Sequence, residues 1–174
     1  QWGIVDVEDC LTGIAHLASQ GLADPHRCAI RGGSAGGYTV LRALTMHPDA
    51  FRVGVCLYGI SDLFALADET HKFEAHYLDS LIGPLPDMAE RYRERSPLFA
   101  AERITSPLIV FQGEEDKVVP PAQSEKIVAS LARRGVAHEY HLFPGEGHGF
   151  RKRENLLACW QATERFLRTH LVFA

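Results

Sequence analysis

One hexapeptide constrains this chain most, the run Gly32-Gly33-Ser34-Ala35-Gly36-Gly37. It follows the apolar residues Cys28-Ala29-Ile30 and leads into a helix-like stretch from Tyr38 to His47. The hexapeptide therefore predicts a strand, a sharp turn and a helix. Glycines two positions before and after Ser34 leave room for the strand and the helix to lie close together. This pattern is typical of a nucleophile elbow, which holds a serine hydroxyl free to attack a carbonyl.

Two other interpretations of the hexapeptide are a plain glycine-rich turn and a loop that binds phosphate at a helix N-terminus. A phosphate-binding loop requires a lysine followed by serine or threonine, but Gly37-Tyr38 stands there. A dinucleotide site requires an acidic residue after the next strand, where the chain has Leu57-Tyr58. The nucleophile elbow is favoured, and it requires a histidine base and an acid from other strand ends.

The acid is expected in the loop that follows a third buried strand, Leu108 to Gln112. This loop presents three carboxylates, and Asp116 is the predicted acid of a catalytic triad. Glu114 and Glu115 are competitors, whose other interpretation is an exposed acidic turn. Asp62 also follows a strand end, and it would serve equally as the cap of the next helix.

The base is expected after the last predicted strand, His138 to Phe143. A glycine-rich loop follows this strand, and its His148 is flanked by glycines on both sides, so we predict His148 as the base. His138 and His141 alternate along the strand and are interpreted as ordinary strand residues. The chain order Ser34, Asp116, His148 is the order of α/β hydrolases.

Strands and helices alternate along the sequence, which predicts an α/β fold with three layers and a mostly parallel sheet of about four strands. The first strand starts after Asp24-Pro25, and the second spans Val53 to Tyr58. A length of 174 residues with 46% apolar content suffices for one core, so we expect a single domain over residues 1–174. Reactive residues of such sheets gather beyond the carboxyl ends of the strands.

Apolar periodicity predicts which helix faces turn inward. A first helix, capped by Asp6 and ending at Gly21, is expected to bury Val7, Cys10, Leu11, Ile14, Leu17 and Ala18. A helix from Ala122 to Arg134 is expected to bury Ile127, Val128 and Leu131. The last helix, Asn155 to His170, is expected to bury Leu156, Trp160, Phe166 and Leu167.

The region Ser61 to Thr105 is long, polar and poor in strands, with helices expected around Phe73 to Leu81 and Asp87 to Arg93. It has two interpretations of equal weight. It forms a wall of the substrate pocket, or it is a surface excursion that packs Phe73, Tyr77 and Leu78 onto the sheet.

Composition argues against several other functions. The net charge is −4, and the clusters Arg133-Arg134 and Arg151-Lys152-Arg153 are isolated, so nucleic-acid binding has no support. Neither an apolar run of about 18 residues nor a signal-peptide pattern is present, so no membrane partner is expected. The four cysteines, Cys10, Cys28, Cys56 and Cys159, lack metal-ligand spacing. They predict buried free thiols, no metal or other cofactor, and a reducing, cytoplasmic location.

The chain resembles the prolyl oligopeptidase family, within it the acylaminoacyl peptidase and dipeptidyl aminopeptidase branch. The resemblance covers nearly the whole chain and rests on Ile30 to Tyr38, Gly113, Asp116, Val119-Pro120, Arg95-Ser96-Pro97, Gly145 and Gly147 to Phe150. It implies a serine peptidase acting on short peptides, and only the C-terminal part of the family's catalytic domain. A carboxylesterase or deacetylase of the same fold remains an alternative, as does a catalytically incomplete fragment that acts only in association.

The elbow supplies one donor for the oxyanion, the backbone N–H of Ala35. The resemblance implies that the second donor is a tyrosine hydroxyl upstream of this chain, so weak turnover of peptides or acyl esters is expected. It also implies that the strand Cys28 to Gly32 is normally central. Its free edge is then expected to pair with a second copy or with the missing N-terminal segment.

Overall fold

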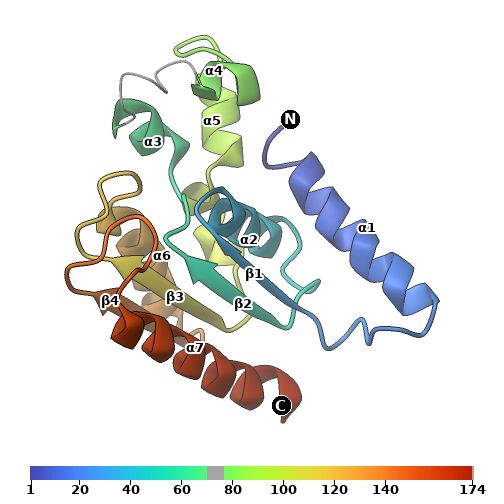
Figure 1. The fold of residues 1–174 in the computed structure, drawn as a ribbon. Helices are drawn as coiled ribbons and strands as arrows, with labels where there is room; N and C mark the ends of the chain where they lie inside the picture. The colour runs from blue at the N-terminus through green and yellow to red at the C-terminus, as the bar shows by residue number, and fades with distance from the viewer. Residues whose placement is uncertain (70–76, 174) are drawn as a thin grey trace.

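The computed structural model describes residues 1–69 and 77–173, in which strands and helices alternate (Figure 1). Its four strands are β1 (Ala29–Gly33), β2 (Val53–Leu57), β3 (Leu108–Gly113) and β4 (His138–Phe143). They form one sheet in the order β1-β2-β3-β4, and each neighbouring pair is parallel. The predicted α/β fold with a parallel sheet is confirmed.

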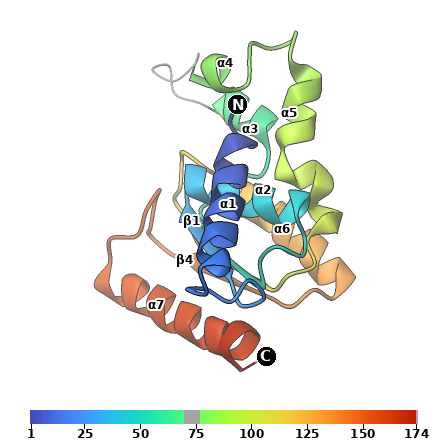
Figure 2. The ribbon, with the colours of Figure 1, turned by 90° about the vertical axis from the view of Figure 1, so that its right-hand side faces the viewer.

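Helices cover both faces of the sheet. They are α1 (Val5–Ser19), α2 (Ala35–Met46), α3 (Leu63–Glu69), α4 (Tyr77–Leu81), α5 (Ala89–Arg95), the 3₁₀ segment η1 (Pro97–Arg103), α6 (Pro121–Arg134), α7 (Arg153–Leu167) and the π-helical turn η2 (Arg168–Val172). Figures 1 and 2 show α7 on one face and α1, α2 and α6 on the other. The three predicted layers are therefore present.

The core is divided by the sheet. All residues of β2 and β3 are buried, as expected of strands covered on both faces. One apolar cluster lies between the sheet and α1, α2 and α6, and includes Leu41, Leu44 and Ile127. A second cluster lies under α7 and includes Phe111 and Phe166.

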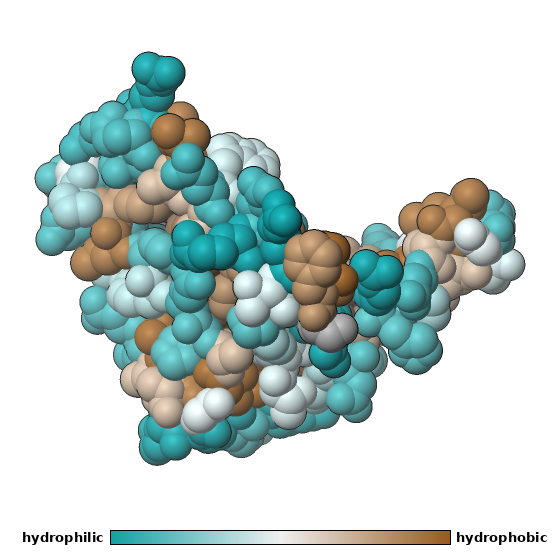
Figure 3. Space-filling view, turned by 90° about the horizontal axis from the view of Figure 1, so that it is seen from below, coloured by the Kyte–Doolittle hydropathy of each residue, from teal (hydrophilic) through white to brown (hydrophobic). Residues whose placement is uncertain are grey.

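Helix α1 differs from its prediction in two respects. Ile4, not Asp6, is the residue at its N-cap. The Asp6 carboxylate instead accepts hydrogen bonds from the Gly3 N–H and the Thr39 hydroxyl, both at 2.6 Å. Leu17 is 45% exposed, because the end of α1 stands off from the body of the molecule. Figure 3 shows this projection with an apolar tip.

The inward face of α7 is also displaced from its prediction. Phe166 is buried as expected and Leu167 packs partly against the core, but Leu156 and Trp160 are exposed. The buried side of the helix consists of Cys159, Ala162, Thr163 and Phe166. Trp160 instead lies beside the edge strand β1, where the Arg31 guanidinium stacks 4.5 Å from its ring.

Helices α3, α4 and α5, between β2 and β3, lie beyond the carboxyl ends of the strands (Figure 1). They share an apolar cluster with Tyr38 of α2, which includes Leu63, Leu78 and Tyr92. Leu78 is buried and Tyr77 is exposed, whereas Phe73 lies outside the described residues. These helices therefore cover the end of the sheet where reactive residues are expected.

Candidate active site

Ser34 occupies a strained turn between β1 and α2. Its φ of 56° and ψ of −121° lie in a region that costs a residue with a side chain about 1–3 kcal/mol. Hydrogen bonds hold the turn on both sides, since the Ser34 N–H donates to the Leu57 carbonyl and the Tyr38 N–H to the Ser34 carbonyl, each at 3.0 Å. The surrounding elements therefore fix the direction of the serine side chain.

Glycines allow this turn to be tight. A Cβ on Gly32 would overlap the backbone carbonyl of Gly36, and a Cβ on Gly37 would lie 2.6 Å from the Cα of Gly59. Gly33 faces the ring of Tyr58, 3.1 Å from where a Cβ would stand. A Cβ on Gly36 would meet nothing within 4 Å. The close approach to a neighbouring strand end is thus made by Gly37, and not by the glycine two positions after Ser34.

The structure brings Ser34, His148 and Asp116 together from three loops. The Ser34 Oγ lies 2.7 Å from His148 Nε2, and His148 Nδ1 lies 2.9 Å from Asp116 Oδ2. An ionised carboxylate can only accept, so Nδ1 is the protonated nitrogen and Nε2 accepts from the serine hydroxyl. The loops follow β1, β4 and β3, at one end of the sheet.

Asp116 is held as a buried carboxylate and is only 3% exposed. Its Oδ1 accepts from the backbone N–H groups of Val118 and Val119, both at 2.9 Å. Burial raises the pKa of Asp116, but the hydrogen bonds from His148, Val119 and Val118 outweigh it and hold the pKa below its usual value. The side chain is therefore an anion aimed at the imidazole.

Gln112, at the end of β3, supports this carboxylate from behind. Its Nε2 donates to Asp116 Oδ2 at 3.2 Å and to the Val119 carbonyl at 3.0 Å. Its Oε1 accepts from the Ser124 hydroxyl of α6 at 2.7 Å. Gln112 was not predicted as a functional residue, because its only signal in the sequence is a polar side chain at the end of an apolar run.

Tyr58, at the end of β2, packs between the nucleophile turn and the histidine. Its φ is 38°, which ends the strand one residue before the predicted boundary. Its ring packs against Gly33, in the space that a larger side chain would occupy. The same ring lies edge-on to His148, with ring centroids 4.9 Å apart. A second ring, Phe150, meets Tyr58 at 5.3 Å. The contact with Tyr58 limits where the His148 ring can lie.

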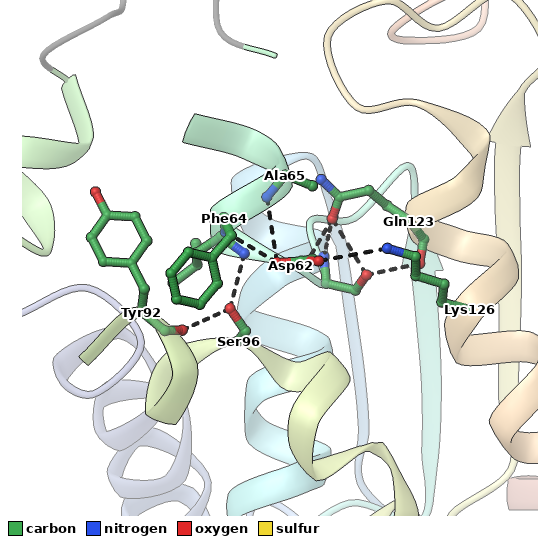
Figure 4. Close-up of polar contacts among 9 residues, drawn as sticks. Asp62, Phe64, Ala65, Tyr92, Ser96, Gln123 and Lys126 are labelled. Atoms are coloured by element: carbon green, nitrogen blue, oxygen red, sulfur yellow. Dashed lines mark hydrogen bonds and ion pairs between the residues drawn. The ribbon is translucent and has the colours of Figure 1, made fainter. Parts of the chain in front are cut away.

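Asp62 has a different role from Asp116 (Figure 4). Its Oδ1 accepts from the N–H groups of Phe64 and Ala65 at the start of α3, and Lys126 lies 3.6 Å from Oδ2. Gln123 Oε1 accepts from the Asp62 N–H at 2.8 Å. Asp62 is thus a helix cap within a polar cluster, which was its alternative interpretation.

The remaining competitors also lie away from the Ser34 hydroxyl. Glu114 and Glu115 are exposed. His138 Nδ1 lies 2.7 Å from the Val136 carbonyl, and His141 Nε2 lies 2.8 Å from Glu139. These two histidines are ordinary strand residues, as predicted.

An apolar cavity of about 440 Å³ opens beside Ser34. It is lined by Trp2, Ser34, Ala35, Ile60, Leu66, Tyr77, Leu78, Val118, Val119 and His148. Leu66, Tyr77 and Leu78 come from the segment between β2 and β3, which therefore forms a wall of this cavity. Trp2 contributes from before α1, where its ring packs on Tyr38 at 4.1 Å.

Within residues 1–69 and 77–173, no group of three or more His, Cys, Asp or Glu side chains could hold a metal ion. Among the same residues, no helix is long and apolar enough to cross a membrane. The four cysteines are free thiols, of which Cys56 and Cys159 are buried and Cys10 and Cys28 are half-buried.

A parallel sheet with a serine on the turn after a strand is the arrangement of α/β hydrolases, and the chain has that fold. A solved structure described as a puromycin-hydrolyzing peptidase of Mycobacterium tuberculosis superposes with a TM-score of 0.94 at 47% identity, covering 98% of this chain and 26% of that one. The model of the prolyl oligopeptidase family matches residues 1–172. The chain belongs to the prolyl oligopeptidase family of serine peptidases.

Two curated relatives support the same family assignment. Dipeptidyl aminopeptidase BIII of Pseudoxanthomonas mexicana is 36% identical over 172 residues, which cover 96% of this chain and 25% of the relative. The acylamino-acid-releasing enzyme of Arabidopsis thaliana is 29% identical over 161 residues, which cover 84% of this chain and 20% of the relative. The chain therefore spans about a quarter of the length of the relatives that it matches.

Proposed function

We propose that this chain is a serine peptidase that cleaves short peptides, with Ser34 as nucleophile, His148 as base and Asp116 as the orienting acid. The observation that carries the proposal is the unbroken hydrogen-bonded series from the Ser34 hydroxyl through His148 to a buried Asp116. A serine hydroxyl is a weak nucleophile unless an adjacent base accepts its proton.

In the first step, His148 Nε2 takes the Ser34 proton while the oxygen attacks the substrate carbonyl. Asp116 holds the imidazole in the correct tautomer and stabilises its cationic form. His148 then gives the proton to the leaving amine, and an acyl group remains on Ser34. Water, deprotonated by the same histidine, releases the acyl group and restores the serine.

The oxyanion formed in each step requires hydrogen-bond donors. Ala35, the first residue of α2, offers its backbone N–H as one donor. Loss of a donor typically costs about 100- to 1,000-fold in rate. Since a second donor is not identified among residues 1–69 and 77–173, we expect slow turnover by this chain alone.

The cavity beside Ser34 supports a preference for substrates with an apolar side chain next to the cleaved bond. Apart from His148, the lining residues that belong to 1–69 and 77–173 carry no carboxylate, amine or guanidinium side chain. A charged substrate side chain would lose hydration there without gaining a partner.

A fluorophosphonate adduct, detected by intact mass, tests the proposed nucleophile. The chain is expected to gain one adduct, whereas Ser34→Ala should gain none and His148→Ala should react at least about 100-fold more slowly. An adduct that survives in Ser34→Ala would contradict the proposal. Peptide amides and simple esters that bear the same apolar side chain then separate a peptidase from an esterase of the same fold.

A further inference from the structure

Glu146 lies two residues before His148 and is buried, with only 2% of its surface exposed. A buried carboxylate is costly unless hydrogen bonds compensate it. Three donors do so here. The Glu146 Oε2 accepts from the Arg151 N–H at 3.0 Å, and Oε1 accepts from the Lys152 N–H at 2.8 Å and from Asn155 Nδ2 at 2.9 Å.

These bonds close a loop around the histidine. The three donors follow His148 in the chain, and Asn155 belongs to α7. The Glu146 carboxylate therefore links position 146, before the histidine, to positions 151, 152 and 155 after it. Residues 147–150 lie inside the ring that these hydrogen bonds close. Within this ring, Gly149 has a φ of 95°, a backbone conformation that favours glycine.

The backbone of Glu146 fixes the same ring to the loop that carries the acid. Its carbonyl accepts from the Glu115 N–H at 2.8 Å. A Cβ on Gly113 would lie 2.5 Å from that carbonyl and would overlap the carbonyl of Gly147. The acid and histidine loops thus touch backbone to backbone, and Glu146 connects both of them to α7.

We propose that Glu146 is a positioning residue, which holds the His148 imidazole in line between Ser34 and Asp116. The inference rests on the proposed function of that histidine as the base. Glu146 does not touch the reacting atoms. It acts through the shape of the ring, and a displacement of about 1 Å in a reacting group can cost about 100-fold in rate.

The three hydrogen bonds to Glu146 require both oxygens of its side chain and the ionised form of the carboxylate. A glutamine at this position would keep one acceptor oxygen, and its amide group could only donate. That amide would face a backbone N–H, so at least one of the three bonds would be lost and two donors would oppose each other. Glu146→Gln is therefore a small change in size that opens one side of the ring.

The first test is a double-mutant cycle on the rate of fluorophosphonate labelling. Glu146→Gln is expected to slow labelling of Ser34 by about 10- to 100-fold, but to cause no further loss in the His148→Ala background. Glu154→Gln is the matched control, because Glu154 is exposed at the start of α7, and it should label like the unmodified chain. An equal loss in both backgrounds, or no loss in either, would overturn the inference.

The second test does not depend on reactivity. The downfield proton resonance of His148 Nδ1, identified by its absence in His148→Ala, reports the bond to Asp116. Glu146→Gln should shift or broaden this resonance, and Glu154→Gln should leave it unchanged. If the unmodified chain does not react with the probe, the proposed function fails, while the resonance still decides the role of Glu146. An unchanged resonance in Glu146→Gln, or none in the unmodified chain, would refute that role.

Discussion

Gly36 and Gly37, neighbours in the nucleophile turn, have opposite surroundings. A Cβ on Gly37 would press on the backbone of Gly59, which cannot move aside as a flexible side chain can. A Cβ on Gly36 would project into open space, from a helical position where alanine is preferred to glycine. Alanine at position 37 therefore tests the steric overlap, whereas alanine at position 36 tests the backbone entropy of glycine in a helix.

We expect Gly37→Ala to lower the free energy of unfolding by roughly 1–3 kcal/mol. Gly36→Ala, the matched control, should raise it by about 0.5–1 kcal/mol, because alanine loses less backbone entropy in a helix. Urea unfolding followed by circular dichroism measures both. Equal midpoints for the two variants would show that the close approach at Gly37 carries no cost.

Single residues differ in how far the sequence reveals them. Ser34 and His148 stand out because glycines lie close to both in the sequence, and the fold places their side chains 2.7 Å apart. Tyr58 has a positive φ, and its ring packs against Gly33 and His148, which are tertiary features that no local pattern records. Glu146 carries a local signal, since it is an acidic residue shortly before a helix, but it was not among the predicted residues.

Among the elements, the loop after β3 makes the protein sensitive to acid. The pKa of Asp116 in the folded chain lies below its usual value, so folding is favoured by the ionised form. That contribution is complete above the ordinary pKa of an aspartate, about 4, and is lost as the pH falls through the lower folded value.

We expect Asp116→Asn to be less stable than the unmodified chain by about 1–3 kcal/mol at pH 7, since a charged acceptor is lost from a buried site. The difference should narrow as the pH is lowered below about 4, where the unmodified chain gives up the same contribution. Urea unfolding at pH 7, 5 and 3.5 measures it. The exposed Glu114→Gln is the control, and a difference that stays constant with pH would contradict the argument.

The order and direction of the elements were predictable, but some of their contacts were not. Strand β3 is a long apolar run, and such a run requires cover on both faces wherever it lies. Helix α7 carries large apolar residues on more than one side, so periodicity alone cannot decide which side faces the sheet. Its small residues Cys159 and Ala162 pack inward. Trp160 lies instead beside Arg31 of the edge strand β1.

At the scale of the whole molecule, the sheet ends in two edge strands, β1 and β4. Among the described residues, β1 pairs with β2 alone. The Cys28 carbonyl accepts from the Arg52 N–H and the Ser34 N–H donates to Leu57, so even-numbered residues of this strand direct their backbone groups to β2. Since these directions alternate along a strand, Ala29 and Arg31 present theirs to the outside.

We expect the chain to associate through this edge, either with a second copy or with further parts of a longer protein. Light scattering over a concentration series should show a dimer. Ala29→Pro removes an outward N–H without touching the bonds to β2, and it should reduce the dimer fraction by about tenfold or more. Ala29→Ser keeps the N–H and is the control. A monomer at every concentration, or an unchanged dimer in Ala29→Pro, would count against the edge.

The chain order of Ser34, Asp116 and His148 determines when the three side chains can come together. Ser34 is made early and His148 more than a hundred residues later, and the two meet only when β1, β3 and β4 lie in one sheet. Without the imidazole, the serine is an ordinary alcohol. Under the proposed function, only the folded chain activates Ser34, and a copy still leaving the ribosome, or one that has lost its fold, does not react.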